Sequence, residues 1–110
     1  MEEEKTKERK KIDDNIIYIG GKPFPNYVMA VITQITKKKL GEIRIIARVK
    51  FISKAVDIAE LARNKFSEGE NKVTIGVIKI GSERFEKTEP DGRGREINVS
   101  VIEIPLIRAK

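Results

Sequence analysis

The 110-residue sequence contains no cysteine and no histidine. Without cysteine the chain has no disulfides and no thiol nucleophile, and without either residue it has no zinc site built from Cys and His. The absence of histidine also excludes catalysis that depends on an imidazole base. The sequence therefore indicates no metal and no cofactor, and it excludes enzymatic mechanisms that need a thiol nucleophile or an imidazole base.

Long apolar runs are missing as well. No stretch approaches the roughly 20 residues that a helix needs to cross a bilayer. The first residues, MEEEKTKERKK, are the opposite of the apolar region of a signal peptide. We therefore expect a soluble protein that stays in the cytoplasm and has no membrane partner.

Positive charge dominates the sequence beyond its first fifteen residues. The 23 Lys and Arg residues outnumber the 17 Asp and Glu residues, which gives a net charge of +6 at pH 7. Residues 1–15 contain six acidic and five basic side chains, so the excess lies entirely in residues 16–110. The segment 43–56 has basic but no acidic side chains, which favours a polyanionic partner. The alternative interpretation is the charged, solvated surface typical of thermophilic proteins.

The length of the chain fits one domain with a single core. Residues 1–15 mix both charges with almost no apolar side chains, so we expect them to form a mobile charged N-terminal arm. Residues 16–110 are predicted to form the folded domain.

Apolar periodicity predicts the element order βαβαββ within this domain. Strands are expected at 16–19 and 42–48, and helices at about 24–40 and 52–66. Two long strands follow, around 73–80 and 97–106, and each changes the phase of its apolar alternation, which suggests a bulge or a change of covered face. This order predicts an α/β two-layer sandwich, with two helices packed on one face of a four-stranded mixed sheet.

The segment KTEPDGRGRE between the two long strands has nothing apolar enough to pack against a core. Asp91 and Gly92 are favourable residues for a hairpin turn. We therefore expect a protruding β-hairpin with a solvated, basic tip.

The second predicted helix has more apolar residues than one face can bury. At 100° per residue, one arc faces the sheet, and it contains Ile52, Ala55, Val56, Ala59, Ala62 and Phe66. Ile58 and Leu61 fall outside this arc and would be wet in a monomer, so we expect them to meet a second subunit in a homodimer. The alternative is that they are scattered surface hydrophobes.

The sequence offers little support for an enzyme. Gly21 and Lys22 suggest a phosphate-binding loop, but Ile16 stands where that motif needs its first glycine, and Pro23 follows the lysine in place of Ser or Thr. The carboxylates of Asp57 and Glu60 are expected on the solvated surface of a helix. We therefore predict no catalytic residues.

Basic residues gather at the two strand-to-helix turns. Lys22 lies in the first turn, and Arg48, Lys50 and Lys54 lie in or next to the second. Because both strands enter helices, both turns are expected at one edge of the sheet, where phosphates would meet cations and helix N-termini together. The hairpin adds four further basic residues, which are Arg84, Lys87, Arg93 and Arg95.

Several motifs resemble the Alba family of archaeal chromatin proteins, over Asn15 to about Lys110. They are IYIGGKPFPNYV at 17–28, ARVKFISKAVD at 47–57, a basic residue before Phe66, the glycine at Gly81, and DGR at 91–93. The resemblance implies the fold of the C-terminal domain of translation initiation factor three. It also implies a homodimer that binds double-stranded DNA and RNA largely without sequence specificity, and that coats and condenses the chromosome. The alternative is an RNA-binding subunit or chaperone of a ribonucleoprotein.

The resemblance also assigns roles to residues. By similarity, Lys22, Arg48, Lys50, Arg93 and Arg95 contact nucleic acid. Phe66 corresponds to an interface residue that joins dimers along DNA, although it would equally serve to close the end of the core. The sequence departs from the family pattern at three positions in the turns. Gly21 replaces the first lysine of the pattern, which is the lysine associated with acetylation. Val49 replaces a glycine, and Phe51 replaces a small residue.

Overall fold

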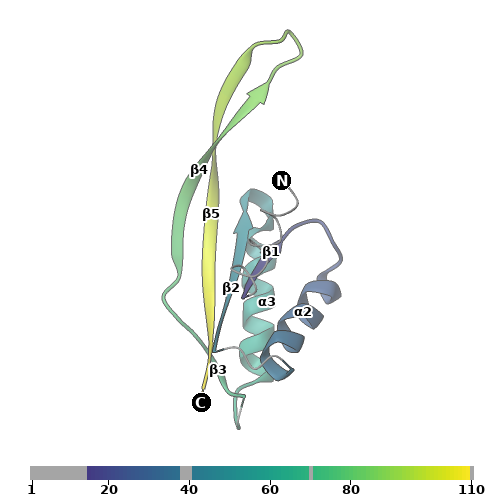
Figure 1. Cartoon of the computed structure of the whole chain (residues 1–110), viewed down its shortest axis with the longest axis vertical. Helices are drawn as coiled ribbons and strands as arrows, with labels where there is room; N and C mark the ends of the chain where they lie inside the picture. The colour runs from purple at the N-terminus through teal and green to yellow at the C-terminus, as the bar shows by residue number, and fades with distance from the viewer. Residues whose placement is uncertain (1–14, 38–40, 70, 110) are drawn as a thin grey trace, which may run out of the picture.

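The computed structural model describes residues 15–37, 41–69 and 71–109 (Figure 1). Its elements are β1 (Ile16–Ile19), α2 (Phe24–Thr36), β2 (Glu42–Arg48), a 3-10 turn η1 (Val49–Phe51), α3 (Ile52–Lys65), β3 (Val73–Ile75), β4 (Lys79–Thr88) and β5 (Gly94–Arg108). The predicted N-terminal arm, apart from Asn15, lies outside the described residues. Neither of the two α-helices among the described residues is long and apolar enough to cross a membrane.

One mixed sheet connects all the strands. β1 is parallel to β2, β2 is antiparallel to β5, and β5 is antiparallel to both β3 and β4. β3 and β4 pair with successive stretches of β5, so they occupy one position in the sheet, and the predicted four-stranded arrangement holds with its third strand divided in two. The break falls at Gly76 to Ile78, where the sequence changes phase. Gly76 approaches β5 closely, since a Cβ there would lie 2.8 Å from the Cδ1 atom of Ile107.

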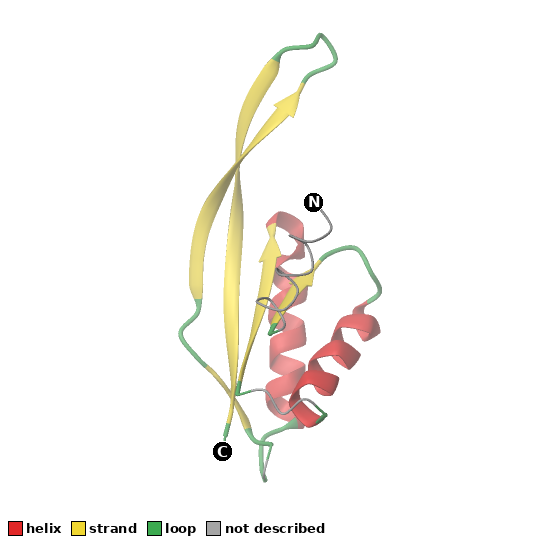
Figure 2. Cartoon of the chain, viewed as in Figure 1, coloured by secondary structure: helices red, strands yellow, loops and turns green. Residues whose placement is uncertain are grey.

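Both helices cover the same face of the sheet, which confirms the predicted two-layer fold (Figure 2). The core follows the alternation of each strand, as in β2, where Ile43, Ile45 and Ala47 are buried and their neighbours are more exposed. Burying these alternate residues removes apolar surface from water, which is the main force that holds the layers together.

The prediction for Ile58 was wrong. Its side chain is fully buried, with 0% of its surface exposed, whereas Val56, which was expected to face the sheet, is 40% exposed. The reason is that α3 packs against α2 as well as against the sheet, so its buried face is turned toward the side that carries Ile58. Leu61 is 42% exposed and is the member of the predicted interface pair that remains on the surface.

The hairpin of β4 and β5 extends beyond the body of the domain (Figure 1). Arg48, the last residue of β2, pairs with Val101, so residues 94–100 of β5 continue past the end of β2. The arm therefore projects from the same end of the sheet as the two strand-to-helix turns. At its tip Pro90 and Asp91 form the middle of the turn, and Gly92 follows with φ of 88°, a conformation that favours glycine.

Candidate nucleic-acid interface

The first strand-to-helix turn is held from inside by Tyr27. The hydroxyl oxygen of Tyr27 accepts hydrogen bonds from the backbone N–H groups of Gly20, at 2.9 Å, and Lys22, at 3.0 Å. Tyr27 reaches the turn because side chains on a helix lean toward its N-terminus. These two N–H groups of the turn are thus already used, and Pro25 in the first turn of α2 has none. The group that this turn presents to solvent is the exposed ammonium of Lys22.

Lys54 joins the second turn to the first. Its Nζ atom donates to the carbonyl oxygens of Gly20, at 2.7 Å, and Lys22, at 2.6 Å. The same ammonium lies 4.9 Å from the centre of the Tyr27 ring and 5.7 Å from that of Phe51. Lys54 was expected among the phosphate contacts, but most of its hydrogen-bonding capacity is spent within the protein, so its main effect is to hold the first turn in place.

The second turn carries backbone strain at Val49. This residue has φ of 51°, in the left-handed region that β-branched side chains rarely adopt. The sequence departs from the family pattern at this position, which has glycine. Beside it Lys50 is exposed, with its ammonium 5.5 Å from the centre of the Phe51 ring. The strained turn thus presents Lys50 to solvent.

Arg48 is already paired with a carboxylate of the arm. Its Nε atom donates to Oε1 of Glu83 at 2.5 Å, and its Nη2 atom donates to Oε2 of the same residue at 3.3 Å. The hydrogen bond from Arg48 holds the pKa of Glu83 below its usual value, and the bond from Glu83 raises the pKa of Arg48. The guanidinium carbon of Arg48 also lies 5.8 Å from the centre of the Tyr18 ring. Sequence reasoning missed Glu83, because no local pattern shows a partner 35 residues away.

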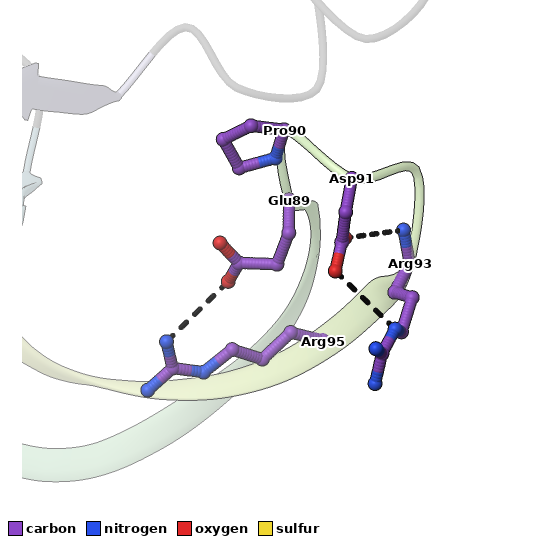
Figure 3. Close-up of a pocket in the computed structure, with 6 residues that line it drawn as sticks. Glu89, Pro90, Asp91, Arg93 and Arg95 are labelled. Atoms are coloured by element: carbon purple, nitrogen blue, oxygen red, sulfur yellow. Dashed lines mark hydrogen bonds and ion pairs between the residues drawn. The ribbon is translucent and has the colours of Figure 1, made fainter.

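The tip of the arm combines arginines with acids (Figure 3). Arg93 forms an ion pair with Asp91 at 3.2 Å, and Arg95 forms one with Glu89 at 3.4 Å. Both arginines are well exposed, with 84% and 67% of their side-chain surface accessible, so these pairs contribute little to stability. Residues 79–100 contain five basic and five acidic side chains, so the arm as a whole is neutral. The expected basic tip is therefore largely offset by its own acids.

The structure brings four of the six predicted contact residues together and leaves two apart. Lys22, Arg48, Lys50 and Lys54 lie at the end of the body from which the arm projects, whereas Arg93 and Arg95 lie at the far end of the arm (Figure 1). Of the predicted interface residues, Phe66 lies at the other end of α3, where it is half-buried against the core.

Comparison with known proteins shows that this chain is similar to members of the Alba family. The sequence profile of the Alba family matches residues 15–82. A DNA/RNA-binding protein Alba from Picrophilus torridus is 43% identical over 96 residues, which cover 87% of this chain and 98% of that relative. One from Methanococcus maripaludis is 40% identical, over 86% of this chain and 99% of the relative. The solved structure of Alba from Thermoplasma volcanium is 42% identical, with a TM-score of 0.70 over 86% of this chain and all of that one.

Proposed function

Because this chain belongs to the Alba family, we propose that it binds double-stranded DNA and RNA with little dependence on base sequence. One observation carries this proposal, which is that Lys22, Arg48 and Lys50 gather at the end of the body from which a thin β-arm extends. Cations of this kind attract phosphates, which repeat along any nucleic acid, and contacts to phosphates carry no information on base sequence. The proposed function is therefore binding, not catalysis.

The arm supports binding without sequence specificity. A two-stranded ribbon is narrow enough to enter a groove of nucleic acid, and arginines at its tip can reach phosphates or base edges there. Because acids in the arm offset its bases, we assign most of the electrostatic attraction to the turns of the body. Arg93 and Arg95 then add contacts to a duplex that the body has already bound.

We propose that two copies of this chain form a dimer and that dimers coat and condense the chromosome in the cytoplasm. Exposed apolar residues support a second copy as the partner, and they include Leu61 on α3 and Val77 and Ile78 in the link between β3 and β4. Closed two-fold pairing would present two arms to one duplex. Contacts through Phe66 would then join neighbouring dimers.

The alternative is an RNA-binding subunit or chaperone of a ribonucleoprotein. The exposed aromatic ring of Tyr18 beside Arg48 favours it, since unpaired RNA bases stack on such rings. Sequencing of the nucleic acid crosslinked to the protein in cells separates the two functions. Broad coverage of genomic DNA supports the chromosomal function, and a few structured RNAs support the alternative.

Binding itself is tested by titrating duplex DNA with the protein across a range of salt concentrations. We expect log affinity to fall with log salt at a slope of about −0.9 for each phosphate contact, and to differ little between two unrelated sequences. A flat salt response, or a strong preference for one sequence, would exclude the proposed mode of binding.

A further inference from the structure

Tyr18 is an exposed aromatic residue that the core does not need. Its neighbours on β1, Ile17 and Ile19, are buried under the helices, whereas 51% of the surface of Tyr18 is exposed on the other face of the sheet. Of the six aromatic residues, only Tyr18 and Phe85 are this open to solvent. No hydrogen bond joins the hydroxyl group of Tyr18 to another described residue, and the ring contacts the guanidinium of Arg48.

The ring borders two hollows in the surface. One, of about 600 Å³, lies at the outer edge of β1, and its walls include Lys22, Pro25 and Asn26. The other, of about 240 Å³, lies on the open face of the sheet, and its walls include Ile46 and Arg48. Because β1 pairs only with β2 among the described strands, none of these strands covers the ring from the outer side. A flat group can therefore reach Tyr18 from solvent.

Basic residues line both hollows. Lys22 lines the hollow at the edge of the sheet, and Arg48 lines the one on the open face beside its ion-pair partner Glu83, with its guanidinium carbon 5.8 Å from the centre of the ring. An aromatic ring between two cations suits a nucleotide whose base stacks on the ring and whose neighbouring phosphates meet the charges. Bases inside a duplex are already stacked and cannot reach such a ring, but unpaired bases can.

We propose that Tyr18 is a stacking site for an unpaired nucleobase of single-stranded nucleic acid, with Lys22 and Arg48 contacting the phosphates on either side. This proposal rests on the proposed function, since it assumes that the turns of the body bind nucleic acid. It adds a second mode of binding, in which the protein holds a single strand on the open face of the sheet, apart from the groove contacts of the arm.

The test compares Tyr18→Leu with the matched control Phe85→Leu, which removes the other exposed ring, on the arm. Each variant is titrated with a single-stranded oligouridine, with the corresponding oligothymidine and with a DNA duplex of equal length. We expect Tyr18→Leu to weaken binding of both single strands by about 5- to 100-fold and to change duplex binding less than twofold. Tyr18→Phe, which keeps the ring, should retain single-strand affinity. The two single strands show whether the site distinguishes RNA from DNA.

A second measurement uses the wild-type protein and does not depend on the folding of a variant. Oligouridine that carries 4-thiouridine is photocrosslinked to the protein, and the crosslinked peptide is mapped. We expect the crosslink in the peptide that contains Tyr18.

Three outcomes would overturn the proposal. They are equal losses for single strands and duplex in Tyr18→Leu, a crosslink confined to the arm, and a Tyr18→Leu variant that changes only the oligomeric state in sedimentation. The last would mean that the ring meets a second copy of the chain. Failure of the proposed function is distinct, because wild-type protein would then bind neither the duplex nor the single strands.

Discussion

Arg48 at the end of β2 and Glu83 on β4 form a two-point ion pair, through Nε to Oε1 at 2.5 Å and Nη2 to Oε2 at 3.3 Å. The pair ties the body to the root of the arm. It also places a carboxylate on a guanidinium that is expected to contact phosphate. Nucleic acid that uses Arg48 must therefore compete with Glu83 for the same donors.

Glu83→Gln should tighten binding of duplex DNA severalfold at low salt, because the amide is a weaker competitor for Arg48 than the carboxylate. The measurement is a titration of labelled duplex by fluorescence anisotropy. Glu86→Gln is the matched control, since it removes one negative charge from the same strand without freeing an arginine. Equal gains in the two variants would show that only the net charge of the arm matters.

The same pair should make stability depend on pH. Arg48 lowers the pKa of Glu83 below the ordinary 4.5, so the stabilisation is present in full above 4.5 and is lost as pH falls through the lowered pKa. We expect the wild type to lose more free energy of unfolding than Glu83→Gln between pH 7 and pH 3. Parallel denaturant titrations of the two proteins measure it, and identical pH profiles would contradict the pair in solution.

Gly21→Lys should strengthen binding, because it adds a cation beside Lys22. Nothing lies within 4 Å of a Cβ atom built at Gly21, so the side chain fits without displacing a neighbour. Each added phosphate contact steepens the salt dependence by about 0.9. Gly41→Lys is the control, since it adds the same charge at an equally open glycine at the other end of β2. Steepening by both lysines alike would argue against a defined interface.

Lys22→Ala should weaken duplex binding far more than Lys37→Ala. A charged contact to phosphate contributes roughly 1.5–3 kcal/mol, whereas a solvated surface lysine contributes little. Lys37 is exposed at the far end of α2, away from both turns. The measurement is the affinity of both variants for duplex DNA in one titration series. Similar losses of affinity would show that Lys22 does not contact the duplex.

Val49→Gly should stabilise the protein by about 1 kcal/mol. Glycine relieves a left-handed conformation that costs other residues roughly 1–2 kcal/mol, and part of this gain is lost to the greater freedom of the unfolded chain. Little packing is lost, because the Val49 side chain is 54% exposed. Thermal or denaturant unfolding measures the change. A loss of stability would mean that Val49 makes contacts that outweigh its backbone strain.

The order of elements could be predicted from sequence for two reasons. Apolar residues alternate along the strands and recur at helical spacing along the helices, and prolines and glycines mark the ends of the elements. The face of α3 could not, since its rotation depends on contact with α2, and Ile58 was misplaced for that reason. The contacts of Lys54 with the first turn also could not be predicted from sequence. They join groups 32 and 34 residues apart, whose approach is set by the register of the whole sheet.

The place of β5 in the sheet bears on how the protein is made. β5 comes last among the described elements in chain order, yet it lies between β2 and β3. Until the ribosome has added it, β3 has no partner strand, and β1 and β2 form a two-stranded sheet that is too small to be stable by itself. The body therefore folds only once β5 has been synthesised. A nascent chain that stalls before Gly94 leaves Ile43, Ile45 and Val73 open to chaperones and proteases.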